Sequence, residues 1–183
     1  VAYVLIVLAL PGCAPGVAPA ATSPTPTPVA SQSALSNAKC ADLIVLGARG
    51  SDQSPSTNHG VGAEVFRSVT SMAEHLHERS KVTVRIVGVP YPAASGPAYT
   101  ANVYTGVSHA GQLLSTLGKE CPDSRFGLVG FSQGAQIVHG TALELKPVQI
   151  RRVVLVAMIA DPRRNPGDTI EHRPRGGGRR VLV

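Results

Sequence analysis

The chain has 183 residues, a length that suits one domain with a sizeable core and argues against two. It contains no tryptophan and few other aromatic residues, so we expect a core of valine, leucine, isoleucine and alanine. Most of the net charge of +6 comes from eight arginines at position 151 and beyond, and because no aromatic residues interleave them, a nucleic-acid-binding protein is not indicated.

The amino-terminal segment predicts export. Val1–Leu10 is uncharged and almost wholly apolar, too short to span a bilayer but typical of the apolar part of a signal peptide. Ala18-Pro19-Ala20 is similar to a cleavage site, so residues 1–20 are predicted to be a signal peptide. In an alternative interpretation, Leu10-Pro11-Gly12-Cys13 is a lipobox whose cysteine carries a lipid and holds the protein at a membrane. Both interpretations place the protein outside the cell or in its envelope.

Residues 21–38 are rich in proline, serine and threonine and predict an extended tether. A globular domain is expected over 39–167, followed by a basic tail rich in glycine and arginine over 168–183. Export leaves Cys40 and Cys121 as an even pair in an oxidising compartment. They are expected to form a disulfide, with two unrelated buried thiols as the alternative.

The globular part alternates strands and helices. Strands are predicted at 43–46, 82–89, 126–129 and 153–159, of which the first and the last are expected to be buried. Helices are predicted at 61–79, 103–117 and 133–145, the first two with one apolar face. This order predicts an α/β fold with a parallel sheet and helices on both faces. In such sheets the chemistry lies beyond the carboxyl ends of the strands, where Gly47 and Ser132 are placed.

Gly130-Phe131-Ser132-Gln133-Gly134 is the most informative motif of the sequence. It stands between a predicted strand and a predicted helix, the context of the nucleophile elbow in α/β-hydrolases. The two glycines permit a sharp turn that exposes the serine hydroxyl. We therefore predict that Ser132 is a nucleophile, with a glycine-rich turn as the alternative.

The segment Gly47-Ala48-Arg49-Gly50-Ser51-Asp52 leaves the first predicted strand. Acyl transfer needs donors for the oxyanion, commonly the backbone N–H after the nucleophile and one from the loop after an early strand. Gln133 and Ser51 are therefore predicted as these donors. Considered alone, the segment could be a plain turn between a strand and a helix, but Ser132 at the end of a neighbouring strand favours the donor function.

These features resemble the cutinase-like serine esterases, which are exported single-domain α/β-hydrolases. The resemblance covers about 40–167 and rests on Cys40, Ala48-Arg49-Gly50-Ser51, Cys121-Pro122, Gly130–Gly134 and Asp161-Pro162-Arg163. It implies a small cutinase-type α/β-hydrolase fold, Ser132 as nucleophile, Ser51 and Gln133 as oxyanion hole, and a Cys40–Cys121 disulfide. It further implies an open site for cutin-like polyesters, short acyl esters or lipid esters, no cofactor, and a monomer.

The resemblance ends after the Asp-Pro loop. Family members carry an aspartate between two cysteines and then a histidine, whereas no cysteine follows Cys121 here. We therefore expect a truncated or divergent member lacking the last elements of the fold. Asp168 and His172 are a candidate replacement for the missing triad residues. The alternative function is a catalytically impaired remnant, either inert or retained as a binding surface.

The other histidines carry no prediction of chemistry. His139 is seven residues beyond Ser132 and is expected to point away from the mouth of the site. The remaining histidines have neither a recognisable partner nor metal-ligand spacing, so no metal is predicted; they are His59, His75, His77 and His109.

Overall fold

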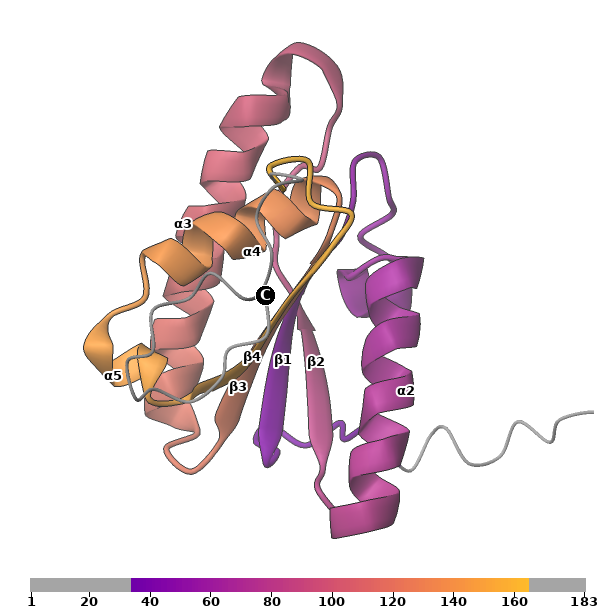
Figure 1. The fold of residues 1–183 in the computed structure, drawn as a ribbon, viewed down its shortest axis with the longest axis vertical. Helices are drawn as coiled ribbons and strands as arrows, with labels where there is room; N and C mark the ends of the chain where they lie inside the picture. Colours follow the sequence, from indigo (N-terminus) through magenta and orange to yellow (C-terminus); the bar gives the residue numbers. More distant parts are fainter. Residues whose placement is uncertain (1–33, 165–183) are drawn as a thin grey trace, which may run out of the picture.

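The computed structural model describes residues 34–164, and the signal peptide, most of the tether and the basic tail predicted above lie outside them. Its centre is a parallel sheet with the strand order β2-β1-β3-β4 (Figure 1). The strands are β1 Leu43–Ala48, β2 Val84–Gly88, β3 Arg125–Phe131 and β4 Val153–Ile159. The predicted α/β fold with a parallel sheet is thereby confirmed.

Helices cover both faces of the sheet, as predicted. On one face lies α2 (Ala63–Ser80), and on the other lie α3 (Tyr99–Glu120) and α4 (Gln133–Leu143), as Figure 1 shows. Three short helices add to these: η1 Asn58–Gly60, η2 Gly96–Ala98 and α5 Pro147–Ile150. The short helices are not among the predicted elements, because segments of three or four residues show no helical periodicity.

The alternation of side chains along β1 explains its continuous apolar sequence. Ile44 and Leu46 belong to the core that α3 and α4 cover, whereas Leu43 and Val45 belong to the core beneath α2. Successive side chains of a strand point to opposite faces, so a strand between two helical layers is apolar at every position. Full burial of one such side chain stabilises the fold by roughly 1.5–3 kcal/mol.

β4 differs from its prediction as a buried strand. Within residues 34–164 it pairs with β3 alone and lies at an edge of the sheet. Val153 and Val156 are buried, but Val154 is 40% exposed. The apolar composition of β4 is that of a buried parallel strand, but at the edge of the described part of the sheet it lacks the second neighbouring strand that would cover it.

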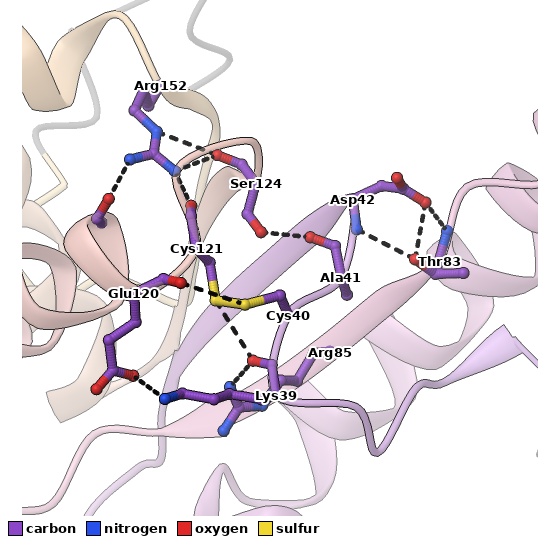
Figure 2. The surroundings of a disulfide bond; sticks show 11 residues. Lys39, Cys40, Ala41, Asp42, Thr83, Arg85, Glu120, Cys121, Ser124 and Arg152 are labelled. Atoms are coloured by element: carbon purple, nitrogen blue, oxygen red, sulfur yellow. Dashed lines mark hydrogen bonds and ion pairs between the residues drawn. A yellow bond between two sulfur atoms is a disulfide. The ribbon is translucent and has the colours of Figure 1, made fainter.

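The Cys40–Cys121 disulfide is present and joins the segment before β1 to the end of α3. Its surroundings at the amino ends of the strands are tied together by further contacts (Figure 2). Ser124 Oγ donates to the carbonyl oxygen of Ala41 at 2.6 Å, and the guanidinium of Arg152 donates to the carbonyl oxygens of Gly118, Cys121 and Ser124. The bridge therefore stabilises the end of the sheet opposite the predicted active site. No helix in the described part of the chain is long and apolar enough to cross a bilayer.

Candidate active site

Ser132 lies at the sharp turn between β3 and α4. Its φ of 52° and ψ of −114° belong to a region that residues with side chains rarely adopt. The turn is held in place because the Ser132 N–H donates to the carbonyl oxygen of Ile159 and its own carbonyl oxygen accepts from Ala135 N–H, both at 2.9 Å. The side chain is half-buried and reachable from solvent. This strained strand-to-helix corner is the geometry that the G-x-S-x-G motif predicts.

The two glycines of the motif are required by close backbone contacts. A β-carbon on Gly130 would lie 2.2 Å from the carbonyl oxygen of Gly134. A β-carbon on Gly134 would lie 2.0 Å from the carbonyl oxygen of Ala48. The start of α4 is therefore packed directly against the end of β1, a neighbour of β3 in the sheet. This contact brings the loop after β1 next to Ser132.

Ser51 and Gln133, predicted as oxyanion donors, are brought together. Ser51 Oγ lies 3.3 Å from Oε1 of Gln133, although the two residues are 82 positions apart. The fully buried Gln133 carboxamide also donates through Nε2 to the carbonyl oxygens of Ala94 and Tyr99, at 3.3 and 3.2 Å. As the first residue of α4, Gln133 has a backbone N–H without an acceptor inside the helix. The Gln133 backbone N–H thus directly follows Ser132, and the Ser51 hydroxyl lies against the Gln133 side chain.

Gln53 braces the loop that carries Ser51. Its Oε1 accepts from the Gly50 N–H at 2.6 Å, and its Nε2 donates to Glu64 Oε2 on α2 at 2.6 Å. The hydrogen bond from Gln53 holds the pKa of the Glu64 carboxyl below its usual value. This brace cannot be recognised in the sequence, because a glutamine in a loop gives no signal of the donor and acceptor it will meet.

Several polar side chains gather around Asp161, in the segment that follows the carboxyl end of β4. The Asp161 carboxylate accepts from the Arg163 N–H at 2.9 Å and lies 3.0 Å from Nδ1 of His139, which is on α4. The Asp161 side chain is only 7% exposed. Burial and the charge of Asp161 raise the pKa of Tyr99, while Arg163 opposes that shift. These four residues form a cluster, hereafter the rim cluster, near the strand end that meets Ser132.

His139 and His109 both have hydrogen-bond partners. The ring of His139, which we expect to point away from the mouth, contacts Asp161. Asp161 is two residues beyond Ile159, whose carbonyl oxygen accepts from the Ser132 N–H. His109 also has a partner, because its Nδ1 lies near the carbonyl oxygen of Pro90. Asp168 and His172 lie outside the described residues. Within residues 34–164, no group of three or more histidine, cysteine or acidic side chains could hold a metal ion.

Comparisons with known proteins agree with this fold. The cutinase family model matches residues 39–175. The cutinase of Hypocrea jecorina is 32% identical over 126 residues, which make up 69% of this chain and 48% of that protein. Carboxylesterase Culp1 of Mycobacterium tuberculosis is 28% identical over 123 residues, or 67% of this chain and 52% of that protein. The chain thus spans about half the length of the curated relatives it matches.

Solved structures also resemble the chain, and two of them illustrate the match. The catalytic core domain of acetyl xylan esterase from Trichoderma reesei has a TM-score of 0.56 and 27% identity, covering 70% of this chain and 67% of that one. Trichoderma reesei cutinase in complex with a C11Y4 phosphonate inhibitor has a TM-score of 0.51 and 28% identity, and the match covers 68% of this chain and 53% of that one. On the extent of the family match, the chain belongs to the cutinase family.

Proposed function

We propose that this protein hydrolyses carboxylic esters and that Ser132 is its nucleophile. The observation that carries the proposal is the strained φ and ψ of Ser132 at the corner between β3 and α4. Strain of this kind is retained where a reactive side chain must be exposed in a fixed direction. Membership of the cutinase family supports the same reaction class.

In the proposed reaction, the Ser132 hydroxyl oxygen attacks the ester carbonyl carbon and passes its proton to a base. The carbonyl oxygen becomes an oxyanion that accepts hydrogen bonds from the Gln133 N–H and from Ser51. When the tetrahedral intermediate collapses, the alcohol leaves with a proton and an acyl group remains on Ser132. Water then attacks this acyl-enzyme and releases the carboxylic acid. Loss of one oxyanion donor typically lowers kcat by about 10²–10³-fold.

The substrates we propose are cutin-like polyesters, short acyl esters or lipid esters. The names of the relatives support this class, since they include cutinases, a carboxylesterase and an acetyl xylan esterase. We also propose that the globular domain spans 39–167 and that the protein is exported and monomeric. The Cys40–Cys121 disulfide supports export, because disulfides persist in oxidising compartments.

A second candidate function is ester binding without efficient turnover. One observation favours it: among residues 34–164, no histidine side chain is hydrogen-bonded to Ser132. A serine hydroxyl without a base is a weak nucleophile, and triad deletions leave only a small part of the catalysed rate.

Hydrolysis of p-nitrophenyl butyrate by the full chain separates the two candidates. Catalytic turnover that disappears in Ser132→Ala supports the esterase, and the matched control is Ser115→Ala on the exposed face of α3. Loss of turnover in His172→Ala or in His139→Ala would identify the base. Enzymatic turnover of the wild type that persists unchanged in Ser132→Ala would overturn the proposal. Wild-type turnover no faster than the uncatalysed reaction would favour the second candidate.

A further inference from the structure

Arg49 is a buried cation two residues before Ser51. It is 4% exposed, although arginine is almost never buried without a partner. Within residues 34–164, the ion pairs are Lys39–Glu120 and His139–Asp161, so no carboxylate lies within 4.0 Å of its guanidinium. Burial of a charge is costly unless other groups satisfy it.

The groups that satisfy Arg49 come mainly from Tyr91. Arg49 Nη2 donates to the Tyr91 carbonyl oxygen, and in return the Tyr91 hydroxyl donates to the Arg49 carbonyl oxygen. The guanidinium carbon also lies 4.7 Å from the centre of the Tyr91 ring, within cation–π range. A further hydrogen bond of 2.9 Å runs from Arg49 Nε to the carbonyl oxygen of Gln53. Arg49 and Tyr91 therefore hold each other reciprocally, and we call this arrangement the Arg49–Tyr91 clamp.

The clamp lies at the junction of three parts of the site. The Arg49 carbonyl oxygen would lie 2.5 Å from a β-carbon on Gly134, so this peptide abuts the start of α4. Two residues after each member of the clamp, the chain reaches Ser51 and Ala93. The Asp52 N–H donates to the Ala93 carbonyl oxygen at 2.7 Å, and Ser51 reaches Gln133. The loop carrying Ser51 is thus fixed both to the segment after β2 and to α4.

We propose that Arg49 is a positioning residue for the oxyanion site, an inference that rests on the esterase function proposed above. The clamp holds the loop so that Ser51 keeps its contact with Gln133, whose backbone N–H is the other proposed donor. The positive charge of Arg49, which no described carboxylate neutralises, also favours the negative charge that develops on the substrate oxygen. Lysine keeps the charge but lacks the planar fork of donors, so it replaces only part of this role.

The test compares Arg49→Met and Arg49→Lys with the wild-type chain, and Arg79→Met serves as the control at an exposed position on α2. We expect kcat for p-nitrophenyl butyrate to fall by about 10- to 100-fold in Arg49→Met with KM within about twofold, since the donors themselves remain. The kcat of Arg49→Lys should lie between those of Arg49→Met and the wild type, and the kcat of Arg79→Met should match that of the wild type. A kcat unchanged in Arg49→Met would overturn the proposal.

Amide hydrogen exchange tests the clamp without requiring activity. The reporters are the N–H groups of Gly50 and Asp52, whose acceptors are Gln53 Oε1 and the Ala93 carbonyl oxygen. In Arg49→Met both should exchange at least about tenfold faster than in the wild type, while the Val45 amide in β1 is unchanged. Exchange at Gly50 and Asp52 that is as slow in Arg49→Met as in the wild type would overturn the proposal, even if the chain hydrolyses no ester.

If Arg49→Met does not fold, Tyr91→Phe replaces it in the exchange measurement. This variant keeps the aromatic ring beside the guanidinium and removes only the hydroxyl that donates to the Arg49 carbonyl oxygen. Faster exchange at Asp52 would support the clamp, and exchange equal to that of the wild type would contradict it.

Discussion

The carbonyl oxygen of Ala48 lies 2.0 Å from the place that a β-carbon on Gly134 would occupy. The end of β1 and the start of α4 therefore meet backbone to backbone, with no room for a side chain. This contact sets the distance between Ser132 and the loop that carries Ser51. The predicted active site thus depends on a glycine that has no chemistry of its own.

Gly134→Ala is expected to destabilise the fold by about 1–3 kcal/mol or more, because the backbone of Ala48 must move to admit the methyl group. The matched control is Gly111→Ala in α3, where nothing lies within 4 Å of the added carbon. In a helix this control change should be neutral or stabilise by up to about 1 kcal/mol. Urea unfolding of the two variants measures the difference. Equal midpoints would show that the close contact does not exist.

Ser51→Ala is expected to lower kcat for p-nitrophenyl butyrate by about 10²-fold with little change in KM, because the hydroxyl acts on the oxyanion and not on the ground state. Ser54→Ala, in the exposed part of the same loop, serves as the control. Steady-state kinetics measure both parameters. A rise in KM at constant kcat would instead assign Ser51 to substrate binding.

Thr83→Val should reveal a pH-dependent contribution to stability. Hydrogen bonds from the Thr83 N–H and hydroxyl to Asp42, of 2.8 and 2.7 Å, lower the pKa of that carboxyl below its usual 3.8 (Figure 2). A carboxyl with a lowered pKa in the folded state stabilises above its unfolded pKa, and this contribution is lost as the pH falls through the folded value.

Thermal unfolding of Thr83→Val should therefore give a lower Tm than the wild type at pH 7, by about 1–4 °C, with a smaller difference near pH 2. Thr116→Val, at an exposed position of α3, controls for the loss of a hydroxyl elsewhere. A difference between Thr83→Val and wild type that is the same at both pH values would contradict the role of Asp42.

The double variant Cys40→Ser, Cys121→Ser should lose about 2–5 kcal/mol of unfolding free energy, because the bridge closes a long loop with a sequence separation of 81. Denaturant unfolding of the oxidised wild type and the double variant measures this loss. Thiol titration of the denatured, unreduced protein should find neither of these two cysteines free. Two titratable thiols at Cys40 and Cys121 would contradict the disulfide.

The elements of the sheet could be predicted because burial imposes composition. A strand such as β1, covered on both faces, has to be apolar at every position, and the sequence shows this directly. By contrast, Pro147–Ile150 is too short for a periodic pattern, and the partial exposure of Val154 depends on whether a further strand lies beside β4. Local pattern determines what an element is but not what covers it.

In the candidate site, too, local features could be predicted from the sequence, whereas contacts between distant residues could not. Ser132 and its two glycines belong to one local motif, so their geometry follows from neighbouring residues. The Arg49–Tyr91 clamp and the His139–Asp161 contact join residues 42 and 22 positions apart. Such contacts arise only when the sheet brings separate strand ends together, and neither hydrophobic periodicity nor motif spacing carries that information.

The most direct test of Ser132 as nucleophile is covalent labelling of the full chain with an alkyl fluorophosphonate, followed by peptide mass spectrometry. We expect one phosphonylated residue, Ser132, with slower labelling in Ser51→Ala and no labelling at this position in Ser132→Ala. A stable adduct on another serine, or labelling of Ser132→Ala equal to that of the wild type, would contradict Ser132 as the nucleophile.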